Sequence, residues 1–191
     1  MRTRTSATIA AILLAGSGVS ASAHLGATTG SALAGGFAHP FGGVDHIAAA
    51  LAVGLWAAMV GARARLWWPA AFVAMMCAGA TIGAAGYSLP GVEAAILVSV
   101  IGLGAVIAFG AAPPLAAGSA VCALFALAHG LAHGAEMPAG ASSMSYVAGL
   151  GLATTLLHGI GLALGRASLG PAARRLAGVA IAAAGVAQAV V

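Results

Sequence analysis

The chain has 191 residues, of which 62% are hydrophobic and only 5% carry a charged side chain. A soluble domain needs far more charge on its surface, so this composition excludes an ordinary soluble protein and predicts an all-α, polytopic membrane protein. The formal net charge of +4 rests on seven arginines in short segments, a pattern that indicates membrane orientation and argues against a nucleic-acid partner.

The first 23 residues have the three parts of a cleavable signal peptide. Two arginines precede a short apolar stretch over residues 7–15, and an Ala-Ser-Ala cleavage site ends at Ala23. The alternative is an uncleaved first helix, which is disfavoured because the apolar stretch is too short to span a membrane. Cleavage would leave His24 at the N-terminus, where its amine and imidazole could chelate a metal, unless the terminus is merely polar and disordered.

Residues 24–191 are predicted to form one domain of six transmembrane helices. Each apolar run approaches the roughly 20 residues that a helix needs to cross the hydrocarbon core, and prolines, glycines or arginines separate the runs. The predicted spans cover 44–61, 67–86, 92–111, 115–134, 144–165 and 173–190. Two small-xxx-small patterns, Gly79 with Gly83 and Gly161 with Gly165, predict close contacts between helices.

An exported N-terminus would set the orientation of all six spans. The first span then runs inward, and every arginine after the signal peptide falls on the cytoplasmic side, as the positive-inside rule expects. The same count puts Asp45, Glu93 and Glu136 at or near the outer ends of helices. We therefore expect a multi-pass membrane protein whose mature N-terminus lies outside the cytoplasm.

Three metal-capable side chains open the first span: His39, Asp45 and His46. Ionisable groups at membrane depth are functional candidates by default. In an unbroken helix the two histidines would lie about 10 Å apart along the axis, too far for one ion. Either the Pro-Gly-Gly stretch between them folds back, or they mark successive stations. The alternative is that Asp45 caps the helix and both histidines are interfacial.

A second group ends the fourth span: His129, His133 and Glu136. Spacings of four and three residues place these side chains on one stripe of a helix. Two histidines one turn apart can bind one divalent ion, with the carboxylate as a further ligand or as an attracting charge. The alternative, a polar stripe that faces water, is less favoured because polar groups inside membranes tend to face internal cavities.

Two further residues are weaker candidates for the metal path. Glu93 opens the third span, where a carboxylate is also favourable simply because of the helix dipole. His158 lies well inside the fifth span. It is either an inner relay for the ion or a histidine that is hydrogen-bonded between helices, and the sequence does not separate these interpretations.

Imidazole and carboxylate ligands without clustered thiols suit nickel, cobalt or zinc. We expect a divalent ion as substrate, no tightly bound cofactor and no phosphate-binding loop for ATP hydrolysis. The partners are then the ion and the lipid bilayer, and the oligomeric state, a homo-oligomer included, stays open. An alternative class is a membrane-embedded zinc hydrolase with a carboxylate as general base. A metal sensor or chaperone is a third, for which six spans are excessive.

At these residues the chain resembles the HupE/UreJ family of bacterial nickel permeases. The family's His-x5-Asp-His motif in the first mature span is matched by His39, Asp45 and His46. Its second motif, Phe-His-Gly-x-Ala/Val-His-Gly-x-Glu, is matched over 129–136, with Ala128 in place of phenylalanine. The larger nickel/cobalt transporter family has a His-x4-Asp-His motif, which fits less well.

The resemblance extends over essentially the whole mature chain. It implies uptake of nickel, with cobalt as a second substrate, across the bacterial inner membrane, in the service of nickel enzymes such as hydrogenase or urease. It also implies a transporter without enzymatic activity, and a metal path that includes the residues of the two motifs. We expect the mechanism to be facilitated diffusion, driven by an inside-negative membrane potential.

Overall fold

The structure is a computed structural model, and it describes residues 31–167 and 170–190. Every regular element in these two ranges is helical, which confirms the predicted all-α class. The predicted signal peptide and His24 lie outside the described residues. The elements are α2 (Ala32–Ala38), the 3-10 helix η1 (His39–Gly42), α3 (Val44–Val60), α4 (Ala62–Ala84), α5 (Val92–Ala108), α6 (Leu115–Ala135), α7 (Ser143–Arg166) and α8 (Pro171–Gln188).

The six apolar runs correspond to α3 through α8, but not all of them have the length of a span. By length and hydropathy, α4, α6 and α7 could each cross a membrane. The segment Ala32–Gly42 passes the same test only together with α3, and α5 is a shorter apolar helix. The described residues thus give three candidate spans, or four with the bent pair, and six spans stay a prediction.

The bent pair arises at Gly42 and Gly43, where the chain turns by 87°. Gly43 is extended, with φ −115° and ψ 128°, and serves as the N-cap of α3. Two successive glycines weaken a helix because they lose more backbone entropy on folding than other residues. Ser31 begins the preceding arm by accepting a hydrogen bond from the Ala34 N–H at 3.3 Å. The arm therefore starts and stops at defined residues and is not a continuation of α3.

Glycines bring the helices together in tightly packed pairs. On α4, a Cβ added at Gly79 would lie 2.6 Å from the Leu127 carbonyl oxygen of α6, and one at Gly83 would strike Leu131. Contacts of the same kind join α3 to α7 and α5 to α8, where a Cβ at Gly104 would lie 2.6 Å from the Gly178 oxygen. This confirms the predicted role of the small-xxx-small patterns, which is to let backbones approach.

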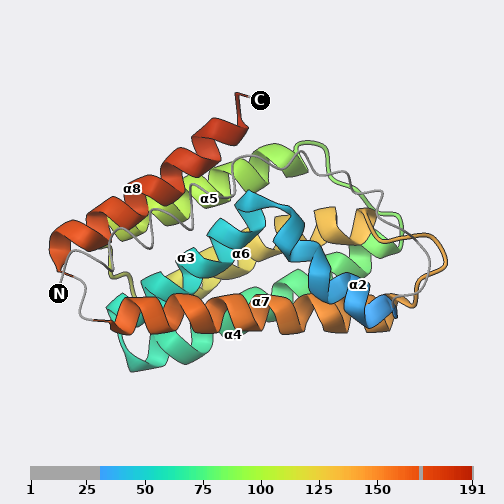
Figure 1. The fold of residues 1–191 in the computed structure, drawn as a ribbon, viewed down its shortest axis with the longest axis horizontal. Helices are drawn as coiled ribbons and strands as arrows, with labels where there is room; N and C mark the ends of the chain where they lie inside the picture. Colours follow the sequence, from blue (N-terminus) through green and yellow to red (C-terminus); the bar gives the residue numbers. More distant parts are fainter. Residues whose placement is uncertain (1–30, 168–169, 191) are drawn as a thin grey trace.

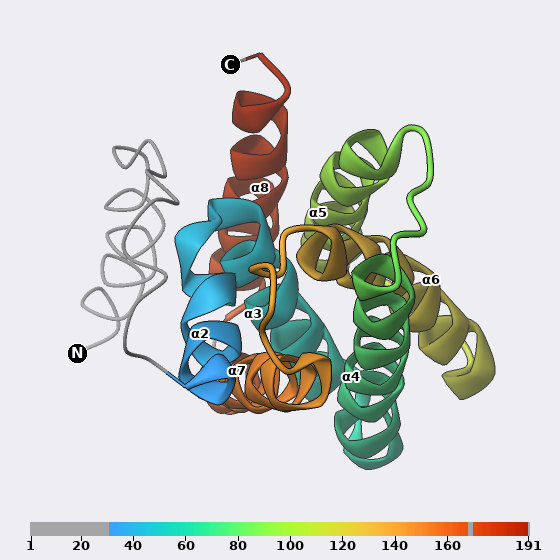
Figure 2. The ribbon, with the colours of Figure 1, turned by 90° about the vertical axis from the view of Figure 1, so that its right-hand side faces the viewer.

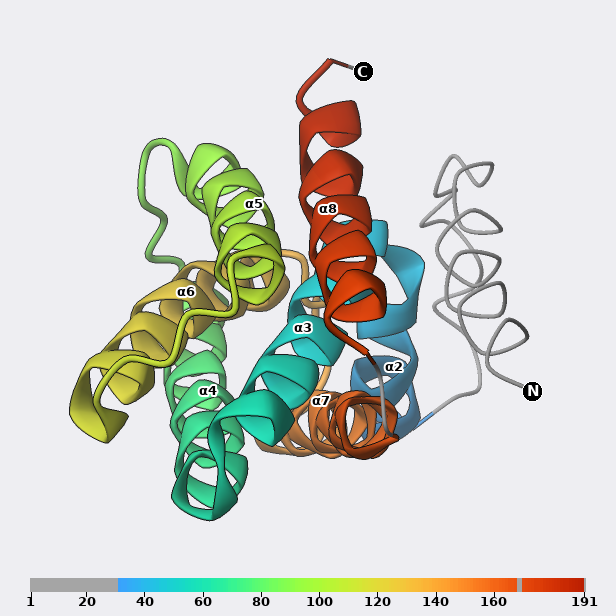
Figure 3. The ribbon, with the colours of Figure 1, turned by 90° about the vertical axis from the view of Figure 1, so that its left-hand side faces the viewer.

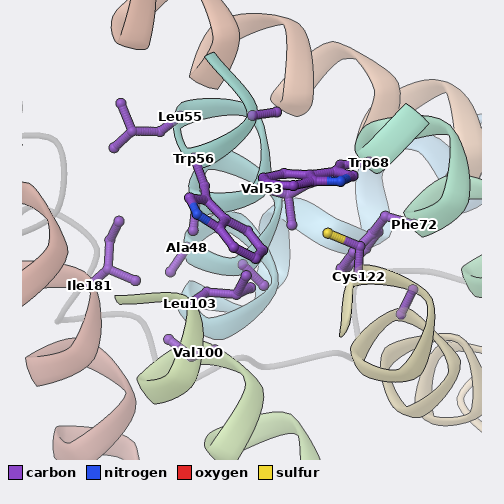
Figure 4. Close-up of a cluster of buried hydrophobic side chains, with 14 of the residues drawn as sticks. Ala48, Val53, Leu55, Trp56, Trp68, Phe72, Val100, Leu103, Cys122 and Ile181 are labelled. Atoms are coloured by element: carbon purple, nitrogen blue, oxygen red, sulfur yellow. The ribbon is translucent and has the colours of Figure 1, made fainter. Parts of the chain in front are cut away.

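Helix α3 lies in the middle of the bundle, with α4, α7, α5 and α8 packed around it. Figures 2 and 3 show this central position from opposite sides, and they show α2 beside α7. One end of the core contains a tryptophan pair, Trp56 and Trp68, with ring centroids 4.2 Å apart (Figure 4). Both are almost fully buried. The central helix therefore connects this apolar core to the residues of the first motif.

The five arginines within the described residues gather at one end of the bundle. Arg63 and Arg65 lie in the first turns of α4, Arg166 ends α7, and Arg174 and Arg175 lie near the start of α8. Figure 1 shows these helix ends on the left. The antiparallel order of the helices places the starts of α3 and α5 and the end of α6, which carry the acidic residues, at the opposite end.

Candidate metal site

His39, His133 and Glu136 form a compact group of three side chains that could hold a metal ion. One ligand atom from each lies within 4.8 Å of the others. His39 Nε2 donates a hydrogen bond to Glu136 Oε2 at 2.9 Å, and the His39 ring meets the His133 ring nearly edge-on, with centroids 4.8 Å apart. His133 is buried, and its Nδ1 has no hydrogen-bond partner among the described residues. Two imidazoles and a carboxylate therefore converge on one point.

The bend at Gly42 and Gly43 makes this convergence possible. It places His39 on a short 3-10 helix beside the end of α6, rather than about two turns before His46 on a continuous helix. The ring of His46, on α3, lies only 4.0 Å from that of His133 between centroids. The chain is thus broken between the two histidines of the first motif, and the His133 ring packs against both of them.

Packing of α2 against α7 holds the arm in place. A Cβ at Gly36 would overlap the backbone of Tyr146, and one at Gly149 would overlap the backbone of Leu33. Tyr146 is itself buried, and its ring centroid lies 5.7 Å from that of His39. Because backbone contacts of this kind leave no room for sliding, the position of His39 is tied to α7.

Glu136 is the exposed ligand of the group and the C-cap of α6. The hydrogen bond from His39 lowers the pKa of the Glu136 carboxyl from its ordinary value, and this outweighs the opposing effect of partial burial. The carboxylate therefore stays ionised, which suits a group that attracts and binds a cation.

Next to this group, His46 and His129 share a hydrogen bond between their Nδ1 atoms at 2.8 Å. His129 Nε2 lies 2.8 Å from the Ser99 hydroxyl oxygen on α5. His129 is not part of the three-residue group, although it lies one turn before His133 on α6. The structure thus separates the two histidines of the second motif into different surroundings.

Asp45 contacts the backbone of its own helix. Its Oδ1 accepts a hydrogen bond from the His46 N–H at 2.9 Å, while its Oδ2 lies 3.8 Å from His46 Nε2. A carboxylate in the first turn of a helix is favourable against the helix dipole. The N-cap of α3 is Gly43, with no side-chain cap hydrogen bond, so Asp45 does not cap the helix, and the His46 ring lies within reach of its carboxylate.

Glu93 and His158 lie apart from the three-residue group. Glu93 is exposed in the first turn of α5, and its charge is close enough to interact with those of Glu136 and Asp45. His158 is buried and donates a hydrogen bond from Nδ1 to the Ala50 carbonyl at 2.7 Å, across α7 and α3. Its Nε2 is buried without a partner among the described residues. His158 is thus hydrogen-bonded between helices, and it keeps one free nitrogen.

Sequence reasoning missed three residues near these histidines. Ser99 contacts His129, Tyr146 lies beside His39, and the Phe72 ring approaches both His129 and His158, with centroids 5.9 and 5.1 Å apart. Each lies in an apolar run without a distinctive neighbour in sequence. Only the serine, a hydroxyl in an apolar segment, offered a signal, and it was a weak one.

Comparisons with known proteins agree on one family. The sequence model described as HupE / UreJ protein matches residues 11–188. Protein HupE of Rhizobium leguminosarum bv. viciae is 42% identical over 170 residues, which cover 87% of this chain and 88% of that protein. No solved structure matches the chain. These findings give no support to the zinc hydrolase alternative.

Proposed function

This chain belongs to the HupE/UreJ family, and we propose that it is a secondary permease that imports nickel ions, with cobalt as a second substrate, across the bacterial inner membrane. The ion is the substrate, and no tightly bound cofactor takes part. The imported nickel supplies nickel enzymes such as hydrogenase or urease. We propose further that α3 through α8 each cross the bilayer, with the arm of α2 and η1 at the outer surface.

The observation that carries this proposal is the convergence of His39, His133 and Glu136 within 4.8 Å. Imidazole nitrogen with a single carboxylate suits nickel, cobalt and zinc, and differs from the oxygen-rich sites of calcium or magnesium. Of the three, His133 is buried, and burying an ionisable group inside a membrane protein is costly unless it serves a function. The ligand set and its position therefore favour a divalent transition-metal ion as the substrate.

The distribution of charge supports inward transport. With the arginine-bearing helix ends in the cytoplasm, as the positive-inside rule prefers, the acidic residues face outward. Glu136, Glu93 and Asp45 would then raise the local concentration of cations at the outer mouth. The His39 and His133 imidazoles would replace part of the water that the ion loses on entry.

Two histidines, the half-buried His46 and the buried His158, continue the path beyond the outer group. His46 adjoins His133, and the Phe72 ring adjoins both His129 and His158. We assign the free Nε2 of His158 to an inner station for the ion. Its Nδ1 hydrogen bond to the Ala50 carbonyl orients the ring, as hydrogen bonds to backbone carbonyls commonly do for metal-binding histidines.

The membrane potential supplies the driving force. An inside-negative potential of about 100 mV gives roughly 2.3 kcal/mol per charge, hence about 4.6 kcal/mol for a divalent ion. This corresponds to an accumulation of roughly a thousandfold. Binding at each station must therefore stay weak enough for the ion to leave it.

The test is uptake into proteoliposomes that contain a metal-sensitive dye and carry an imposed inside-negative potential. Wild type should take up nickel, with competition from cobalt, whereas His133→Gln should reduce uptake at least tenfold. Gly159→Ala is the matched control, because a Cβ at Gly159 would meet no neighbouring atom. Undiminished uptake by His133→Gln would contradict the proposed path. Tightly bound zinc without any flux would contradict the function.

A further inference from the structure

Three side chains from three helices, two of them buried and the third, His46, half-buried, are joined end to end beside the ligand group. The Ser99 hydroxyl oxygen of α5 lies 2.8 Å from His129 Nε2 of α6. The other ring nitrogen of His129, Nδ1, lies 2.8 Å from Nδ1 of His46 on α3. Ser99 and His129 are at most 2% exposed. With water excluded, these contacts decide where the protons lie.

The serine fixes the first proton. The Ser99 hydroxyl donates to the Ile96 carbonyl oxygen at 2.6 Å, and a carbonyl can only accept. A hydroxyl has a single proton, so Ser99 has none left for the histidine and must accept from it. His129 therefore carries its proton on Nε2.

The second proton follows from the first. A neutral imidazole, the form that burial beside another histidine favours, has one N–H and one acceptor nitrogen. With Nε2 protonated, His129 Nδ1 is the acceptor of the 2.8 Å hydrogen bond, and the donor is His46 Nδ1. The nitrogen of His46 that keeps its lone pair is then Nε2, on the ring that packs against His133.

We propose that Ser99 and His129 are positioning residues that hold His46 in its Nδ1–H tautomer and leave Nε2 as its cation-binding nitrogen. This inference rests on the proposed function in so far as the ion reaches His46. Metal-binding histidines commonly donate their second N–H to a fixed acceptor, which sets both tautomer and ring orientation. Here the acceptor is another imidazole, itself anchored by a serine. His129 thereby supports a ligand instead of being one.

The direct test is nitrogen NMR of the purified full chain with ¹⁵N-labelled histidine, in lipid nanodiscs and without added metal. In wild type, the pyrrole-like signals should belong to Nε2 of His129 and Nδ1 of His46. Ser99→Ala should abolish this preference, and Ser99→Thr, which keeps the hydroxyl, should restore it. A wild-type His46 protonated on Nε2 would overturn the inference, and so would tautomers that Ser99→Ala leaves unchanged.

Nickel uptake gives a second readout. Removing an outer partner of a metal-binding histidine typically weakens metal affinity about 10–100-fold. Ser99→Ala should therefore raise the half-saturating nickel concentration by that factor with little change in maximal rate. Thr155→Val is the matched control, because the Thr155 hydroxyl donates to the Gly151 carbonyl at 2.7 Å in the same manner but lines a groove between α4 and α7.

The NMR and uptake measurements together separate this inference from the proposed function. If wild type carries no nickel but shows the expected tautomers, the proton arrangement stands and the transport proposal fails. If wild type carries nickel while Ser99→Ala shifts neither the tautomers nor the half-saturating concentration, Ser99 has no positioning role.

Discussion

The tryptophan pair and the histidine cluster differ in where their polar side-chain atoms find hydrogen-bond partners. The histidine cluster consists of His39, His46, His129 and His133, together with Glu136. Trp56 Nε1 donates to the Ala111 carbonyl at 2.8 Å, and Trp68 Nε1 donates to the Leu115 carbonyl at 3.1 Å. Each indole has a single donor, and the backbone satisfies it. The histidines instead bond to one another, to a serine and to a carboxylate.

This difference separates a structural role from a binding role. Once its indole N–H is bonded to a backbone carbonyl, a tryptophan has no further polar atom that could bind a ligand. Its burial therefore mainly stabilises the fold. The His46 imidazole, which donates to His129 through Nδ1, keeps a lone pair on Nε2, and a cation can use it. Changes in the first region should therefore alter stability, and changes in the second should alter transport.

The largest effect is expected from Trp68→Ala. The Trp68 side chain is fully buried against Trp56, and truncation of a buried aromatic side chain typically costs about 3–5 kcal/mol. Thermal unfolding of the purified protein should show this loss, whereas the folded fraction should still bind nickel with wild-type affinity. A variant with normal stability and lost nickel binding would reverse the roles of the two regions.

His158→Phe should reduce nickel uptake rather than stability. The substitution removes a buried nitrogen that has no partner among the described residues, and an apolar ring of similar shape avoids that penalty. Because the variant also loses the Nδ1 hydrogen bond to the Ala50 carbonyl, the two effects oppose each other. We expect stability close to that of wild type, and at least a tenfold loss of uptake if His158 is the inner station. Unfolding and uptake measured on the same preparation would distinguish a transport role of His158 from a structural one. Reduced stability with normal uptake would make His158 structural, like the tryptophans.

Trp56→Phe should have a smaller effect, confined to stability. It keeps the ring in the core but removes the N–H that bonds to the Ala111 carbonyl. Loss of one such hydrogen bond costs about 0.5–1.5 kcal/mol. Unfolding at a series of denaturant concentrations should detect it, with uptake unchanged. A large drop in uptake would show that the tryptophan end also takes part in transport.

The smallest effect is expected from the hydrogen bond between His39 and Glu136. Because it lowers the pKa of Glu136 from the ordinary value of 4.5, the ionised carboxylate contributes stability above that value. The contribution disappears as the pH falls through the lowered pKa. Glu136 is more than half exposed, so solvent screening limits the contribution to the low end of about 0.2–1 kcal/mol. Wild type should exceed Glu136→Gln in stability at neutral pH and match it in acid. A difference that persists in acid would exclude this electrostatic cause.

The sequence predicted the helices of the bundle well because apolar length and turn residues are local properties. The predicted run 44–61 became Val44–Val60, and 115–134 became Leu115–Ala135. The short arm Ala32–Ala38 was missed because it has too few residues and too many glycines for a periodic signal. The pattern of apolar residues also does not decide whether α3 and α5 cross a bilayer, because both helices are shorter than a full span.

For the candidate site, the sequence predicted the residue types but not their arrangement. The two motifs named every histidine of the cluster, because ionisable groups stand out in an apolar chain. The direction in which the chain leaves Gly43 is not a local property, so the distance from His39 to His46 stayed open. The contact of Ser99 with His129 depends on which helices become neighbours, and a serine that bonds to its own helix looks ordinary in sequence.

The glycine contacts described above have a mechanical consequence for the histidine cluster. Within each pair, α4 with α6, α3 with α7 and α5 with α8, backbone lies against backbone, and such seams resist separation. Two hydrogen bonds of the cluster, from His46 to His129 and from His129 to Ser99, run from one pair to another. A third, from His39 to Glu136, joins the arm of α2 and η1 to the end of α6. These hydrogen bonds join the helix pairs and the arm to one another. A cation that takes over Nε2 of His39 therefore replaces the hydrogen bond between the arm and α6, so loading and unloading the site also changes how firmly the arm is held.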